Sequence, residues 1–254
     1  MCCCPHAGGS WREAMVIGDA DHVLTVVPPE LAVEQAAMLR VNPATAWRML
    51  RDFTELAAGD FVVQNAGNSA VGRLVIQIAK ANQWRTISLV RRPELIDELR
   101  ALGGDVVLLD NDEAKDQIAA VTGGAPVRLA LNAVGGDSAL RIANALTPGG
   151  SHVTYGAMGR QPLRIPNGLL IFKDLRWRGF WVTRWYREAS REAEAAMFEG
   201  LFALARRGLL HTPVERIYPL SEAVAAVKHA AQSRRTGKIL FGAPEIIAQF
   251  SARP

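Results

Sequence analysis

The sequence has 254 residues, of which 49% are hydrophobic and 21% are charged. This composition supplies a sizeable core and excludes a disordered chain, and the length indicates one large domain or two unequal ones. The net charge of +4 is spread without a block of lysine or arginine, so we expect anionic small molecules rather than nucleic acid as ligands.

The cysteines and the apolar runs predict the environment of the protein. All three cysteines stand at positions 2–4, without the C-x-x-C spacing of a metal cage and without partners for a disulfide framework. A reducing, intracellular compartment is therefore expected, and no metal site. No signal peptide is present, and no apolar run approaches the roughly 20 residues that span a bilayer. We expect a soluble protein with no membrane partner.

The first part of the chain predicts a short strand and two helices. A β-like run covers His22–Val27, before two prolines, and a helical pattern covers Leu31–Leu39. A second helix is expected to begin at Asn42 and Pro43, because asparagine caps helices and proline fits the first turn.

From residue 61 onward, apolar runs alternate with helical patterns. The expected strands are Phe61–Gln64, Thr86–Val90, Val106–Leu109, Leu129–Asn132, His152–Tyr155 and about Trp177–Val182. The expected helices lie at about Val71–Ala79, Pro93–Leu102, Glu113–Val121 and Ser138–Leu146. The first five strands lack clean alternation, which is typical of strands buried on both faces. The pattern predicts an α/β fold with a Rossmann-type, doubly wound parallel sheet of six strands.

The last part of the chain leaves this pattern. Ser190 is expected to cap a long amphipathic helix that ends at Gly208, and Ser221 to cap a further helix. GKILFG, residues 237–242, predicts a final strand. Both chain ends are expected to meet in a second, smaller unit. The predicted domains are 1–40, 41–185 and 186–254.

The stretch VVQNAGNSAVG, residues 62–72, runs from the first expected strand of the sheet into a helix. Where a dinucleotide loop usually has three glycines, this turn has Ala66, Ser69 and Gly72. Such a turn presents free backbone N–H groups at a helix N-terminus, where pyrophosphate binds, and Asn68 adds a side-chain donor. Taken alone, A-x-x-S-x-x-G is also compatible with an ordinary turn. Its place in a βαβ unit favours a nucleotide.

The end of the next strand carries Arg91 and Arg92. An NAD-binding unit usually has an acidic residue here, about 20 positions after the loop, which accepts the ribose 2′-hydroxyl. A guanidinium instead binds a 2′-phosphate through two hydrogen bonds. The alternative is a pair of solvent-facing arginines. We therefore predict NADPH rather than NADH.

Two further loops leave the carboxyl ends of expected strands, where ligands of open α/β sheets bind. They are Asn132–Gly136 and Thr154–Gly159. In the second, Tyr155 can stack or donate a hydrogen bond, and Gly156 permits close approach of the backbone. The alternative is that both are merely tight turns.

Five segments together resemble the medium-chain dehydrogenase/reductase superfamily. They are RVNPATAWRML, GDFVVQNAGNSAVG, VTYGAMGRQP, LLIFKDLRWRGFW and GKILF. Within the superfamily they resemble the 2-enoyl thioester reductases of the mitochondrial trans-2-enoyl-CoA reductase type, over about residues 8–241. The resemblance implies a Rossmann domain inserted in a GroES-like β domain, whose remnant both chain ends would form, and a homodimer.

The resemblance also implies a reaction and a set of contacts. Members reduce the C2=C3 bond of enoyl-CoA or enoyl thioesters of acyl carrier protein with NADPH, in fatty acid synthesis. The implied cofactor contacts are Asn42, Asn68, Ser69, Ala70, Val71, Arg91, Tyr155, Gly156, Ala157, Met158, Phe180, Trp181, Val182 and Lys238. For Phe180 and Trp181 the alternative is core packing, and for Lys238 a solvated strand end.

The chain departs from the family in one respect. The family's catalytic tyrosine lies in an N-terminal segment that has no counterpart here, so no catalytic residue is assigned and impaired activity is expected from a truncated chain. A quinone oxidoreductase-like reductase and a catalytically dead NADPH-binding protein are the alternative functions. The absence of a G-H-E motif argues against the zinc of neighbouring dehydrogenases. The expected location is cytoplasmic if the source is bacterial, or mitochondrial if eukaryotic, although no transit peptide is found.

Overall fold

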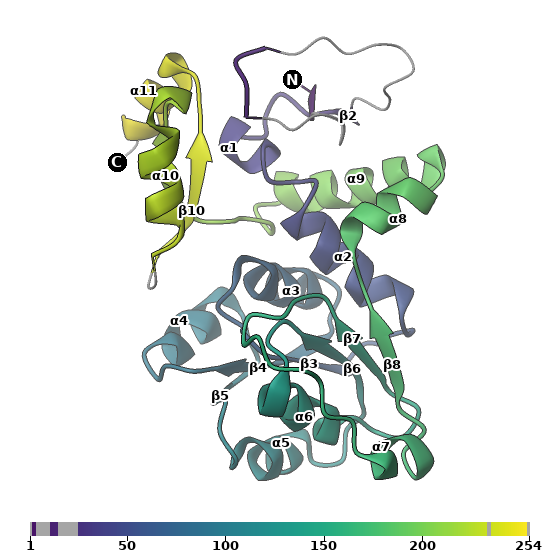
Figure 1. Ribbon diagram of the computed structural model, residues 1–254. Coiled ribbons are helices and arrows are strands. Elements are labelled where there is room, and N and C mark those ends of the chain that lie inside the picture. Colours follow the sequence, from purple (N-terminus) through teal and green to yellow (C-terminus); the bar gives the residue numbers. More distant parts are fainter. Residues whose placement is uncertain (1, 4–10, 15–24, 233–234, 253–254) are drawn as a thin grey trace. The chain divides into compact units, whose positions relative to one another are not determined.

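The computed structural model describes residues 2–3, 11–14, 25–232 and 235–252 (Figure 1). The chain forms two compact units, one of Asn42–Ala189 and one of Met1–Val41 with Ser190–Pro254. In the described ranges, no helix combines the length and apolar character needed to cross a membrane.

The first unit is built on a six-stranded sheet in which every pair of neighbours is parallel. Its strands, in the order 5-4-3-6-7-8, are β5 (Val106–Leu109), β4 (Arg85–Val90), β3 (Phe61–Gln64), β6 (Val127–Asn132), β7 (Ser151–Thr154) and β8 (Arg176–Gly179). The predicted α/β fold with a parallel six-stranded sheet is confirmed. The strand order reverses between β3 and β6, and at such a reversal an open sheet leaves a crevice beyond its carboxyl ends.

The helices of this unit are α2 (Asn42–Asp52), α3 (Ala70–Ala81), α4 (Leu95–Leu102), α5 (Ala114–Thr122), α6 (Gly136–Ala145), α7 (Asn167–Ile171) and α8 (Val182–Glu188). Helices α3 to α7 join successive strands along the chain, whereas α2 precedes β3 and α8 follows β8 (Figure 1). The amphipathic stripe predicted on α3 explains its position, because Leu74, Val75 and Ile78 are at most 1% exposed. Helix burial of this kind supplies most of the stability of helices in proteins.

The predicted sixth strand was too long. It ends at Gly179, and Val182 begins helix α8 instead of closing the strand. The reason is that β8 is an edge strand, whose exposed arginines blur the apolar run that marks the inner strands. Asn42 is the first residue of α2 itself, not a cap before it.

The second unit combines short strands with helices. Its elements are β1 (Cys2–Cys3), β2 (Thr25–Val26), α1 (Val33–Ala36), α9 (Arg191–Arg206), β9 (Val214–Tyr218), the 3₁₀ helix η2 (Leu220–Glu222), α10 (Ala223–Ala230), β10 (Lys238–Phe241) and α11 (Pro244–Ser251). β1 and β2 are antiparallel, while β9 and β10 are parallel. Arg40 joins the two parts of this unit through a 2.8 Å ion pair with Glu194 on α9.

Two predictions in this unit need correction and one holds. Ser190 caps α9 as predicted, since its Oγ accepts a 3.2 Å hydrogen bond from Ala193 N. The helix expected over Leu31–Leu39 is only the single turn α1. Ser221 lies inside η2 and is no cap, because the chain tightens into a 3₁₀ turn before α10. β2 covers the end of the run expected at residues 22–27, whose first three residues lie outside the described part, as does Cys4.

Candidate functional site

Three loops at the carboxyl edge of the sheet, after β3, β6 and β7, lie next to one another. The β7 loop is held to the β6 loop by backbone hydrogen bonds from Tyr155 N to Asn132 O, Met158 N to Ala133 O, and Gly159 N to Val134 O, of 2.9–3.0 Å. The structure thus brings the predicted residues 155–158 beside the strand-order reversal.

The β3 loop has the geometry of an anion site. Ser69 is the N-cap of α3, and its Oγ accepts a 3.1 Å hydrogen bond from Gly72 N. The amides of Ala70 and Val71 belong to the first turn of the helix, which leaves its N–H groups without intrahelical acceptors. These N–H groups and the positive end of the helix dipole favour a phosphate at this place. A pyrophosphate fits the residues present.

Gly72 is required by close packing of helix against loop. A Cβ at this position would lie 2.5 Å from Gly67 O and 2.8 Å from Ala66 O. Ala66 itself adopts a left-handed conformation, with φ of 48°. Of the three positions that usually hold glycine, the third therefore keeps it for lack of space, while alanine bears backbone strain at the first.

Tyr155 and Ser69 come together at this edge. Burial raises the pKa of Tyr155 to about 12, and the nearby Ser69 hydroxyl opposes this shift. The Tyr155 hydroxyl is buried, yet no described group meets it in hydrogen-bonding geometry. A buried, unsatisfied hydroxyl beside an anion-binding turn fits a ligand group that would complete its hydrogen bonds.

Arg91 directly follows β4 and is exposed. Its neighbour Arg92 pairs with Glu94 at 3.4 Å, whereas Arg91 is in no ion pair with any described residue. A guanidinium without a carboxylate partner is available for an anionic ligand. Of the two adjacent arginines, only Arg91 is therefore a candidate to bind the 2′-phosphate of NADPH.

The residues placed by resemblance alone have mixed surroundings. Phe180 N donates to Thr154 O at 2.9 Å, and its ring packs edge-on against Phe53 at 6.0 Å. Val182 is buried, whereas Trp181 is 60% exposed. The core-packing alternative, stated for Phe180 and Trp181, thus describes part of Phe180 and fails for Trp181.

Three further predicted positions differ from one another in exposure and location. Met158 is exposed, and Asn42 is half-buried at the start of α2. Lys238 belongs to the second unit, at the start of β10. Burial lowers the pKa of Lys238, and the charge of Arg235 adds to the shift. A lysine so perturbed is not a freely solvated strand end.

Two asparagines lie beneath the loops: Asn65 was not predicted from the sequence, and Asn132 was named only as the start of a loop. Asn65 and Asn132 are 0% exposed and hydrogen-bond one another at 2.8 Å. Asparagine placed directly after an apolar strand run is the signal that could have found them.

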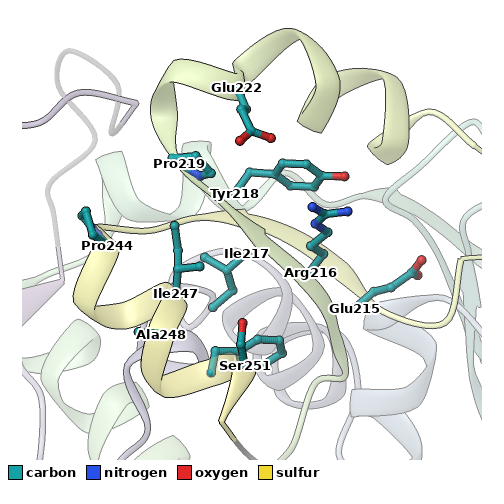
Figure 2. A pocket seen from close by; sticks show the side chains of 11 residues that line it. Glu215, Arg216, Ile217, Tyr218, Pro219, Glu222, Pro244, Ile247, Ala248 and Ser251 are labelled. Carbon is teal, nitrogen blue, oxygen red and sulfur yellow. The ribbon is translucent and has the colours of Figure 1, made fainter.

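A pocket of about 570 Å³ lies in the second unit (Figure 2). Its wall contains Arg216, whose guanidinium stacks 4.4 Å from the ring centre of Tyr218, and apolar residues of α11 such as Ile247. No predicted cofactor residue lines this pocket. It therefore does not contribute to the candidate site.

No cluster of three or more histidine, cysteine, aspartate or glutamate side chains suited to a metal is found among the described residues. The expectation of no metal stays a prediction, since the cysteine side chains lie outside that part of the chain.

The chain has clear relatives of known name. The zinc-binding dehydrogenase family matches residues 70–199. The mitochondrial enoyl-[acyl-carrier-protein] reductase of Mus musculus is 43% identical over 210 residues, 81% of this chain and 56% of the relative. The enzyme of Homo sapiens is 41% identical over 225 residues, which cover 87% of this chain and 60% of the relative. That of Dictyostelium discoideum is 35% identical over 237 residues, which cover 91% of this chain and 67% of the relative. The chain spans about three fifths of its mammalian relatives' length.

Solved structures agree with these relatives. A mutant enoyl thioester reductase from Candida tropicalis superposes with a TM-score of 0.81 at 31% identity, covering 92% of this chain and 71% of the other. The Etr1p complex with NADP and crotonyl-CoA superposes with a TM-score of 0.78 at 31% identity, covering 89% of this chain and 68% of the other. An NADPH:quinone reductase from Bacillus thuringiensis superposes with a TM-score of 0.80 at 24% identity, covering 87% of this chain and 67% of the other. At this identity the likeness supports the fold alone.

Proposed function

This chain belongs to the enoyl thioester reductases of the zinc-binding dehydrogenase family, and we propose that it reduces the C2=C3 bond of 2-enoyl thioesters with NADPH. The observation that carries the proposal is the Ser69-capped turn, which lies beside the unsatisfied Tyr155 hydroxyl. The relatives named enoyl-[acyl-carrier-protein] reductases and the Etr1p complex with NADP and crotonyl-CoA support the choice of substrate class.

The residues present would hold NADPH by its charged groups. The amides of Ala70 and Val71 would bind the pyrophosphate, and Arg91 the 2′-phosphate. Gly156 packs closely on the β6 loop, since a Cβ there would lie 3.0 Å from Ala133 O, and it is proposed as a backbone contact of the nucleotide. The other residues implied by the resemblance, Trp181 and Lys238 among them, are proposed as further contacts.

Bound NADPH would supply a hydride to the substrate β-carbon, and the resulting enolate takes a proton at its α-carbon. The chain contributes by fixing donor and acceptor in contact, which removes much of the entropic part of the barrier. No described side chain is assigned as the proton donor.

The test of the function is NADPH oxidation by the chain with crotonyl-CoA and with a crotonyl thioester of acyl carrier protein. Turnover with either supports the proposal, and their relative kcat/KM values decide between the two carriers. A faster rate with quinones would favour the quinone reductase alternative. NADPH binding without turnover of any of these would favour an NADPH-binding protein that is catalytically dead.

Arg91→Ala is expected to raise the KM for NADPH about 10- to 100-fold, because a hydrogen-bonded charge pair contributes roughly 1.5–3 kcal/mol. NADH has no 2′-phosphate, so its KM should stay unchanged. Arg92→Ala is the matched control, since Arg92 already pairs with Glu94, and it should leave both KM values within about twofold. Steady-state kinetics with each nucleotide measures the difference. An equal rise for NADPH and NADH in Arg91→Ala would contradict the assignment.

We propose a homodimer that forms through β8. This strand is the edge of the sheet, so its outer backbone groups have no strand partner in the described chain. The adjoining Ile171 and Phe172 are 68% and 83% exposed. A heterodimer of Etr1p and Etr2p from Candida tropicalis is among the similar structures. Phe172→Lys is expected to shift sedimentation equilibrium towards monomer, while Val121→Lys, an exposed position on α5, should not.

The second unit is proposed as part of a GroES-like β domain formed by both chain ends. The parallel pair β9–β10 supports this, because parallel strands are seldom stable as an isolated pair. For a eukaryotic source we propose a mitochondrial location, on the strength of the relatives' names.

A further inference from the structure

The two buried asparagines at the carboxyl edge of the sheet connect groups that are distant in sequence. Asn65 Nδ2 donates to Asn132 Oδ1 at 2.8 Å and to Ser138 Oγ at 2.9 Å. Its Oδ1 accepts a 2.8 Å hydrogen bond from Ala133 N. Both amide hydrogens and the oxygen of Asn65 are therefore used, and all three bonds lead to the β6 loop and the helix that follows it.

Asn132 extends these bonds to the third loop. Its Oδ1 also accepts from Val134 N at 3.1 Å and Gly135 N at 3.0 Å, which fixes the backbone after β6. Its Nδ2 donates to Thr154 Oγ1 at 3.1 Å, at the end of β7. The same loops are joined again by the backbone bonds that begin at Tyr155 N.

Ser138 carries the network to a fourth strand. Its hydroxyl donates to Asp110 Oδ2 at 2.5 Å, and Arg141 Nη1 donates to Asp110 Oδ1 at 3.0 Å. Asp110 follows β5 directly. Ser138, which accepts a hydrogen bond from Asn65, is thus itself fixed by its bond to Asp110, and this limits the ways in which the network can relax.

We propose that Asn65 and Asn132 are positioning residues, which hold the loops after β3, β6 and β7 as one unit in the geometry that the nucleotide requires. Neither side chain is exposed, so each acts through the loops and not by contact. The amide suits this role because it offers donors and an acceptor on one short, uncharged group. A fully satisfied buried network of this kind rigidifies its surroundings. The inference rests on the proposed binding of NADPH.

The test compares Asn65→Leu with the unaltered chain and with Leu146→Ala. Leucine has a similar volume but removes all three hydrogen bonds. Leu146 is 1% exposed, in the segment between α6 and the start of β7, so its truncation lowers stability at the opposite edge of the sheet. At 10 °C, where urea titration shows each protein folded, we expect Asn65→Leu to raise the NADPH Kd about tenfold or more, by fluorescence titration. Leu146→Ala should stay within about twofold.

Amide hydrogen exchange without nucleotide gives a second readout. Asn65→Leu should speed exchange in residues 133–136 and 155–159, and Leu146→Ala should not. Unchanged exchange there, or an equal loss of affinity in Leu146→Ala, overturns the inference. If the unaltered chain binds no NADPH, the proposed function fails, while the exchange data still decide whether the asparagines hold the loops.

Thr154→Val supplies a milder variant if Asn65→Leu does not fold. It removes only the hydrogen bond from Asn132 Nδ2 and keeps the shape of the side chain. Faster exchange confined to residues 154–159, with a Kd raised about three- to fivefold, supports the role of Asn132. Exchange and affinity equal to those of the unaltered chain contradict it.

Discussion

Gly72→Ala is expected to abolish measurable NADPH binding and to lower the free energy of unfolding by about 2 kcal/mol. The added methyl would lie 2.5 Å from Gly67 O and 2.8 Å from the Gly67 carbonyl carbon, both of them backbone atoms. Backbone cannot rotate away as a flexible side chain can, so α3 must move relative to the loop. The movement displaces the Ser69 cap and the free amides together. Fluorescence titration and urea unfolding measure the two effects.

Gly168→Ala is the matched control. Its Cβ would meet nothing closer than 3.6 Å, at the Phe172 ring, and it lies within helix α7. Alanine should be neutral there or stabilise the helix by up to about 1 kcal/mol, with no change in NADPH affinity. Normal NADPH binding by Gly72→Ala would show that the α3 turn is not the phosphate site.

The protein is expected to lose about 3 kcal/mol of stability as the pH falls from 6.5 towards 4, because of His152. This histidine is 0% exposed, and both ring nitrogens lack hydrogen-bond partners among the described residues. Burial lowers its pKa from 6.5 to about 4. Between these values the unfolded chain binds a proton that the folded chain excludes, so stability rises with pH across this window. Above pH 6.5 the penalty is absent, and below about pH 4 it is complete.

His152→Phe should flatten this dependence, since a phenyl ring keeps the stacking on Trp177, whose ring centre lies 3.9 Å away, and does not titrate. Urea unfolding followed by circular dichroism at pH 7.5, 5.5 and 4.5 measures the slope. A slope in His152→Phe equal to that of the unaltered chain would contradict the assignment.

Much of the sheet could be predicted from local pattern, because its inner strands are continuous apolar runs closed by turn residues. Phe61–Gln64 and Val106–Leu109 are correct to the residue. The failures lie where burial is partial. Strand β8 carries exposed arginines and gives way to a helix after Trp181, and α11, with no fully buried residue, was not predicted.

Of the candidate site, only the residues proposed to contact the nucleotide could be predicted. Ser69 and Arg91 are visible because a loop motif and a strand end fix their positions in the sequence. The hydrogen-bond network beneath them is not visible, since Asn65 bonds to Asn132 and Ser138, which lie 67 and 73 positions further along the chain. Such contacts depend on the order of the strands in the sheet, and no local pattern contains it. The same holds for His152, whose pKa depends on the residues that cover it.

The hydrogen bonds that join the three loops run between groups of the protein itself and require none from a nucleotide, which affects when conformational entropy is lost. Ordering a loop residue costs roughly 1–2 kcal/mol of entropy, and here that loss occurs as the protein folds. Little of it is left for the moment of binding, so the nucleotide meets a rigid receptor and association should approach the rate set by diffusion and orientation.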